Sequence, residues 1–213
     1  APGCGAALRQ RVEALTQREA SLAEEVVRER MAKQEKAEQL RELHREMPSG
    51  ESLAAFKNTL KHRAGLPSSV LSFLKTLPVE GHPMEWLISG LVRFGMVAKT
   101  GDYMEDALNL IANAPELVAA IFRIRSGWGD PIAPNHDLGL IENFVHMLGV
   151  PGADDQRLTK LLRTFYILHM DHGGGNLSTF TGKAVASGHA DIYASLAAAM
   201  CGLYGPLHGR ANQ

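Results

Sequence analysis

Residues 169–213, HMDHGGGNLSTFTGKAVASGHADIYASLAAAMCGLYGPLHGRANQ, carry the strongest indications of fold and function in this chain. The stretch begins with a histidine pair and a triple glycine, from His169 to Gly175, and ends with a second motif, Gly-Pro-Leu-His-Gly around His208. Between them, the small residues of Ala194–Gly202 are typical of a buried helix that packs closely on its neighbours. Packing alone does not require imidazoles beside glycines at helix ends, so the stretch predicts a functional site in a helical protein.

The rest of the chain after Ser52 also follows a helical period. Apolar residues recur about every 3.6 residues, and the segments are separated by glycine and proline. We expect helices at 53–60, 70–77, 84–98, 103–112, 115–125, 138–148 and 158–170. Pro115 suits the first turn of its helix and Gly149 suits a helix end. No run of alternating β-branched residues or hairpin turn occurs, so the expected fold class is all-α.

Residues 1–50 form a separate region of high charge. Ala7 to Glu46 contains neither glycine nor proline and predicts an amphipathic helix or helix pair, docked on the main domain or on a dimer mate. Glu19 and Glu29 fall at core positions of the heptad, which argues against a sustained coiled coil. We therefore divide the chain into an N-terminal helical region, 1–50, and a helical domain, 51–213.

Composition excludes several classes of partner. The 213 residues are 45% hydrophobic, which allows a sizeable core. Because 22 basic and 23 acidic side chains nearly cancel, no global field recruits nucleic acid or an anionic membrane. No apolar run approaches the roughly 20 residues of a membrane span. Cys4 and Cys201 do not suggest a disulfide framework, which favours a reducing compartment.

Four segments, in order, resemble the citrate synthase family, whose members join an acyl-CoA to a 2-oxo acid. They are RAGLPSSVLSFLKTLPVEGHPM at 63–84, ENFVHMLG at 142–149, DHGGGNLST at 171–179 and GPLHGRANQ at 205–213. The resemblance implies the helical large domain of a homodimeric acyltransferase of the tricarboxylic acid cycle. That enzyme condenses acetyl-CoA with oxaloacetate and water to give citrate and CoA, with acetyl-CoA as substrate and no separate cofactor.

The resemblance makes His208 the catalytic residue that stabilises the enol of acetyl-CoA. We expect His208 at the start of a helix, where the positive end of the helix dipole disfavours imidazolium and favours a neutral ring. Ser178 occupies the family position whose hydroxyl braces this histidine. Asn176, on the same turn, is either a supporting hydrogen-bond donor or a helix cap.

By the same resemblance, His172 hydrogen-bonds the oxaloacetate, helped by glycines that let backbone amides approach a ligand. Spacing alone, without the resemblance, favours His172 as a cap at a helix C-terminus. His169 is either a support for the site or a buried histidine with its hydrogen bonds satisfied. This pair lacks a companion cysteine or second carboxylate at ligand spacing, so no metal site is expected.

The resemblance also leaves alternatives open. A 2-methylcitrate synthase using propionyl-CoA shares every motif, and a non-catalytic dimerisation or scaffold module is the alternative outside the enzyme class. Gly173 and Arg210 depart from the residues common at these positions in the family. Family members continue past the GPLHG turn into a small domain with a catalytic aspartate, so we expect the chain to be an inactive fragment. We expect a bacterial cytoplasmic location, or the mitochondrial matrix in a eukaryote.

Overall fold

The computed structural model describes residues 49–170 and 174–209, together with scattered N-terminal residues. The latter are 11, 17–18, 21–22, 24–25, 27–28 and 31, and all of them are helical. The rest of the helix expected from Ala7 to Glu46 lies outside the described residues. The chain divides into two compact units, Ala1–Ser52 and Leu53–Gln213, and the second carries the features discussed below.

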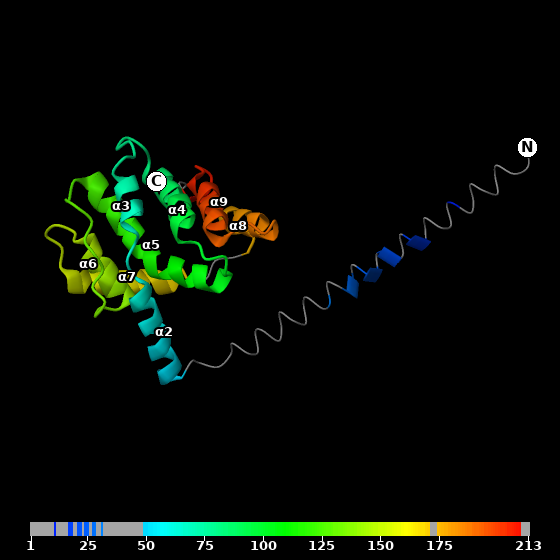
Figure 1. Ribbon diagram of the computed structural model, residues 1–213, viewed down its shortest axis with the longest axis horizontal. Coiled ribbons are helices and arrows are strands. Elements are labelled where there is room, and N and C mark those ends of the chain that lie inside the picture. The colour runs from blue at the N-terminus through cyan, green and yellow to red at the C-terminus, as the bar shows by residue number, and fades with distance from the viewer. Residues whose placement is uncertain are drawn as a thin grey trace, which may run out of the picture. The chain divides into compact units, whose positions relative to one another are not determined.

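The described residues form eight α-helices and no strand, which confirms the expected all-α class. Figure 1 labels them from α2 onward. The helices are α2 Gly50–Arg63, α3 Ser68–Leu74, α4 Pro83–Ala98, α5 Tyr103–Ser126, α6 Leu140–Leu148, α7 Asp155–Leu168, α8 Leu177–Ser187 and α9 Ile192–Tyr204.

The main core lies where α3, α4, α5 and α9 meet. Its largest fully buried side chains include Trp86 from α4, Leu117 from α5 and Tyr193 from α9. Figure 1 shows α9 beside α4, with α8 on the other side of α9. A second, smaller cluster joins α5 to α6 through Ala119, Phe144, Met147 and Leu148, with Leu162 of α7 packed against it. The fold thus places α8 and α9 as a pair on one side of the central helix α5.

Helix α5 corrects the expectation of two helices separated at Pro115. The proline lies inside one continuous helix, although its missing N–H and its ring cost a helix interior about 3 kcal/mol. Leu110 and Leu117, on either side of the proline, are buried in the same core cluster. Their burial favours one continuous helix through the core, and this outweighs the local cost of the proline.

The continuity of α5 also changes the estimate of membrane-spanning potential made from the sequence. By length and composition α5 is a candidate to cross a bilayer. However, 56% of its apolar window is buried inside the protein. The same helix supplies Leu110, Leu117, Ala120 and Ile121 to the main core. Its hydrophobicity is therefore accounted for by the interior of the protein.

Helices α4 and α9 cross at a glycine. A Cβ atom added at Gly95 would lie 2.7 Å from the Tyr193 Cβ, closer than two side chains can approach. The Tyr193 ring also meets Phe94 edge to face, with 5.1 Å between ring centroids. Burial, reinforced by the Asp106 carboxylate, raises the pKa of Tyr193 to about 12, so the phenol stays neutral in the core.

We expect Gly95→Ala to destabilise the protein, although alanine is the better helix former by about 1 kcal/mol. The new methyl group meets the stiff Cβ of Tyr193, and overpacking of this kind costs about 1–3 kcal/mol. Gly50→Ala is the control, because no atom lies within 4 Å of a Cβ added there. Urea unfolding followed by circular dichroism makes the comparison. Equal midpoints for the two variants would contradict the close approach of α4 to α9.

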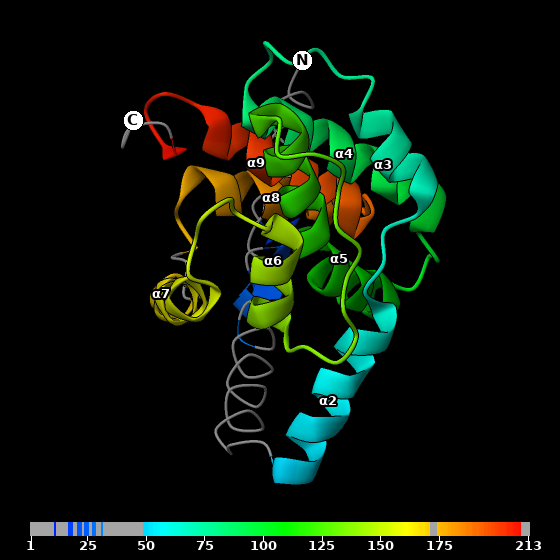
Figure 2. The same ribbon diagram turned by 90° about the vertical axis from the view of Figure 1, so that its left-hand side faces the viewer.

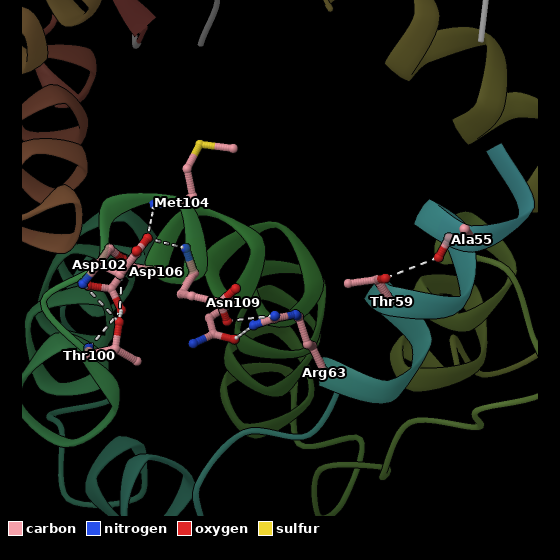
Figure 3. A network of polar contacts seen from close by, with 9 residues as sticks. Ala55, Thr59, Arg63, Thr100, Asp102, Met104, Asp106 and Asn109 are labelled. Atoms are coloured by element: carbon pink, nitrogen blue, oxygen red, sulfur yellow. Dashed lines mark hydrogen bonds and ion pairs between the residues drawn. The ribbon is translucent and has the colours of Figure 1, made fainter. Parts of the chain in front are cut away.

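Polar contacts fix the C-terminal end of α2 against α5 (Figure 3). The Arg63 guanidinium donates to Asn109 Oδ1 at 2.9 Å and to Glu105 Oε2 at 2.6 Å. The Asn113 side chain binds the residues at the end of α2. It donates to the Arg63 carbonyl at 2.9 Å and accepts from Gly65 N at 2.8 Å. The last turn of α2 is therefore held by side chains of the central helix.

The loop after α2 is anchored by a buried carboxylate. Glu116 accepts the Leu66 N–H at 2.7 Å. Burial raises the pKa of Glu116, while the bond from Leu66 works in the opposite direction. The hydrogen bond gives the loop a fixed attachment point on α5, the helix that also holds Arg63.

Candidate functional site

His208 lies in the turn that follows α9. Its backbone N–H donates to the Gly205 carbonyl at 3.0 Å, which closes the turn. A Cβ atom at Gly209 would collide with the Leu203 carbonyl, so the chain passes too close to the end of α9 for any side chain there. Gly205 and Gly209 thus bracket a tight turn that holds the His208 side chain in one place.

The structure brings His208 and Ser178 together. Ser178 Oγ lies 3.0 Å from His208 Nε2, and the Ser178 backbone nitrogen lies 3.4 Å from the same ring nitrogen. Ser178 is 5% exposed and stands at the second position of α8, where backbone N–H groups have no partner within the helix. The His208 ring therefore serves as a cap for the N-terminus of α8.

This arrangement determines how the imidazole hydrogen bonds. A backbone N–H can only donate, so Nε2 acts as the acceptor, and the serine hydroxyl can donate to the same atom. In a neutral imidazole, Nδ1 then carries the hydrogen. The outcome is a ring with its donor on Nδ1, suited to a hydrogen bond with a carbonyl or enol oxygen.

The helix N-terminus that the structure places at the His208 ring is that of α8. We expected a helix beginning just after His208, but residues 210–213 lie outside the described residues. The described backbone N–H that contacts the ring is that of Ser178 in α8, 30 residues away in sequence. Spacing alone could not reveal this pairing, because it depends on how α8 packs on α9.

Two glycines bring α8 and α9 close enough for the contact. A Cβ at Gly202 would lie 3.3 Å from Ser178 Cα, and one at Gly182 would lie 3.1 Å from Ala199 Cβ. Both distances are shorter than ordinary side-chain contacts, so each glycine allows close backbone approach. The small residues of Ala194–Gly202, predicted to form a closely packed helix, thus set the distance between Ser178 and the His208 turn.

Asn176 stands at the N-cap of α8. Its backbone carbonyl accepts from Phe180 N at 2.8 Å, but its side chain makes no capping hydrogen bond. The sequence left two roles open for Asn176, a supporting hydrogen-bond donor or a helix cap. Asn176 occupies the N-cap position, but its side chain makes no capping hydrogen bond. The described cap at Ser178 comes instead from His208.

The histidine pair is only partly described. His172 lies outside the described residues. His169 ends α7 as an exposed residue, with Nδ1 2.7 Å from the Phe165 carbonyl and its ring stacked on the Phe165 ring, 4.0 Å between centroids. The buried alternative for His169 is therefore wrong, because its ring lies at the surface. No hydrogen bond joins it to His208 or Ser178, all three of which are described.

One contact near the site was not expected from the sequence. Tyr204, the last residue of α9, donates from its hydroxyl to Glu85 Oε1 at 3.1 Å and packs its ring on His82, 4.9 Å between centroids. Glu85 and His82 form a capping box at the start of α4. The contact between Glu85 and Tyr204 could not be predicted from the local sequence, because the two residues are far apart in the chain. The capping box itself, a cap residue with Glu three positions later, is a pattern that the sequence shows. This contact ties the end of α9, and so the start of the His208 turn, to α4.

Known proteins are similar to this chain in sequence and in the arrangement of its helices. The family model for the citrate synthase C-terminal domain matches residues 12–213. Citrate synthase 4, mitochondrial, of Arabidopsis thaliana is 38% identical over 78% of this chain and 38% of its own length. Citrate synthase, mitochondrial, of Daucus carota is 36% identical over the same shares. The chain thus spans about two fifths of these relatives, 38% in each case.

Solved structures give the same result. Citrate synthase from Thermotoga maritima superposes with a TM-score of 0.66 and 30% identity, over 78% of this chain and 43% of that structure. Citrate synthase from Pyrobaculum aerophilum gives 0.66 and 29%, over 78% and 44%. Since the family model covers nearly the whole sequence and the helices superpose on solved members, this chain belongs to the citrate synthase family.

Proposed function

We propose that this chain provides part of the active site of an enzyme that condenses acetyl-CoA with oxaloacetate to give citrate and CoA. The observation that carries the proposal is the His208 ring, which accepts at Nε2 from Ser178 and so presents its N–H at Nδ1. A fixed N–H donor is the group needed where negative charge develops on a thioester oxygen.

The proposed mechanism gives each histidine its own substrate. A general base removes a proton from the methyl group of acetyl-CoA, and His208 Nδ1–H stabilises the enol oxygen that results. The enol carbon then forms a bond to the ketone carbon of oxaloacetate, which His172 holds by a hydrogen bond. The π bond of the ketone breaks in this step, and its oxygen takes up a proton to become the hydroxyl of citrate, which balances the proton removed by the base. Water cleaves the thioester of the citryl-CoA product, releasing citrate and CoA.

Partners and location follow from the family in the same way. We propose that the enzyme works as a homodimer, since the chain exposes large apolar side chains on α7, including Leu161, Phe165, Ile167 and Leu168. Exposed patches above a few hundred Å² are uncommon on monomers. The curated relatives named above are plant mitochondrial enzymes, which supports the mitochondrial matrix over a bacterial cytoplasm.

The Ser178 contact supplies the test of this proposal. We expect Ser178→Ala in the active enzyme to lower turnover about fivefold, because one of the two hydrogen bonds that orient His208 is lost, and such bonds are worth about 1 kcal/mol. Oxaloacetate affinity should change little, since Ser178 acts on the acetyl-CoA side. The release of free CoA, followed with a thiol reagent, measures turnover.

Ser195→Ala is the matched control. This second buried serine of the α8–α9 pair is 7% exposed, and its hydroxyl donates to the Asp191 carbonyl at 2.9 Å, within its own helix. Equal losses of turnover in both variants would mean that Ser178 acts through packing, and the role given to the Ser178–His208 contact would be wrong.

A further inference from the structure

A groove separate from the His208 turn lies between α2, α5 and α6, with Arg163 of α7 at its border. Its volume is about 660 Å³. Small-molecule sites typically measure about 300–1,000 Å³. The groove is therefore of the right size for one small molecule. None of the residues assigned to the condensation line it.

Most of the residues that line the groove are apolar. Leu53, Phe56 and Leu60 follow one another along one face of α2, at spacings of three and four residues. Across from them lie Ala112, Pro115 and Met147, all buried. Phe56 remains 46% exposed and Leu53 39% exposed, so the apolar face of α2 is left uncovered by the described residues. Such a surface suits an aliphatic chain.

Positive charge borders this apolar strip. Lys57 and Lys61 lie one helical turn apart on α2, and Arg163 stands at the other edge. Arg163 is already paired with Glu142, and Lys61 Nζ donates to the Asp137 carbonyl at 2.9 Å. Lys57 has no hydrogen-bond or ion-pair partner among the described residues. With three cations and one carboxylate on its lining, the groove attracts an anion, and Lys57 is the cation available to bind it.

The groove is also held in shape before any ligand arrives. Figure 3 shows Arg63 reaching from α2 to Asn109 on α5. On the other side, His136 Nδ1 lies 2.7 Å from the Lys61 carbonyl, which joins the loop before α6 to α2. Both contacts lie near the C-terminal end of α2, and Figure 2 shows the rest of this helix extending below α5 and α6. A wall fixed from two sides loses little further freedom on binding, which favours affinity.

We propose that this groove binds an amphiphilic anion, a linear aliphatic chain that ends in a carboxylate. The chain lies along Leu53, Phe56 and Leu60 against α5, and the carboxylate pairs with Lys57. This occupant fits both observations at once, since a neutral lipid leaves the lysines unused and a soluble dianion leaves the apolar strip exposed. The inference stands apart from the condensation chemistry and is tested without measuring turnover.

The test is calorimetric titration of the chain with dodecanoate, below the concentration at which it forms micelles. We expect saturable binding of one dodecanoate per chain. Dodecylammonium, with the same tail and the opposite charge, should bind at least about tenfold more weakly, the effect of losing one charge-assisted hydrogen bond. Equal binding of the two probes would overturn the proposal, because it would indicate adsorption by the tail alone.

Two pairs of variants locate the site. Lys57→Glu should weaken dodecanoate binding by about tenfold or more, whereas Lys183→Glu, at an exposed lysine of α8 outside the groove, should not change it. Phe56→Asp should abolish binding, whereas Phe122→Asp should not, although both phenylalanines are 46% exposed. Unchanged binding in Lys57→Glu and Phe56→Asp would overturn the proposal. The proposal would also fail if the unaltered chain is a dimer that binds no dodecanoate and Phe56→Asp makes it a monomer. That result would mean that a second copy of the chain covers the groove.

Discussion

Replacing His208 by alanine in the active enzyme is expected to lower turnover by roughly 10²–10⁴-fold while leaving oxaloacetate binding nearly intact. The hydrogen bond from Nδ1 strengthens only as charge develops on the thioester oxygen, so its loss affects the transition state far more than the ground state. Because Ser178 fixes Nε2 as the acceptor, no other ring atom can supply this donor. Steady-state kinetics beside calorimetric titration with oxaloacetate separate the two effects.

His172→Ala provides the contrast in the same pair of measurements. If His172 holds the oxo acid throughout the reaction, its loss should weaken oxaloacetate affinity as well as turnover. The two variants are thus expected to differ in binding more than in rate. If His208→Ala loses oxaloacetate affinity yet keeps its rate at saturating substrate, the enol-stabilising role given to His208 is wrong.

The helices were predictable wherever local signals agree with the core. The expected segment at 84–98 becomes α4, Pro83–Ala98, because proline opens it and its apolar period matches its buried face. Gly149 was expected at a helix end, and it ends α6 in the left-handed conformation, with φ of 51°. The prediction of two helices separated at Pro115 was wrong. The local preference of proline for a helix start is outweighed by a core that buries residues on both sides of it.

The candidate site was predictable only in part, for a related reason. The motifs indicate His208 and Ser178 as site residues. They do not show that Ser178 supplies both hydrogen bonds to Nε2, because this depends on the close packing of α8 on α9 at Gly182 and Gly202. The groove beside Lys57 left even less trace in the sequence. Its walls come from three helices, and each contributes residues that read as an ordinary amphipathic face.

The second large effect concerns Arg123, whose guanidinium is buried and surrounded by backbone carbonyls. Its Nε donates to Asp130 O at 2.8 Å, and Nη2 donates to Trp128 O at 2.6 Å. Nη1 donates to Leu148 O at 2.9 Å and to Gly149 O at 3.2 Å, at the end of α6. Arg123 therefore joins the end of α5 to the end of α6 and satisfies carbonyls that the helices leave without a partner.

We expect Arg123→Ala to lower the free energy of unfolding by about 3 kcal/mol or more, because each buried carbonyl left without a donor costs about 1–3 kcal/mol. Arg123→Lys should recover only part of this, since one ammonium cannot reproduce the fork of donors. Arg163→Ala is the control, an arginine whose side chain is 58% exposed in its pair with Glu142. Loss of such a surface pair should cost at most about 1 kcal/mol. Urea unfolding of the three variants measures these differences. If the unfolding midpoint of Arg123→Ala is no lower than that of Arg163→Ala, water replaces the guanidinium with no loss of stability and the role given to Arg123 is wrong.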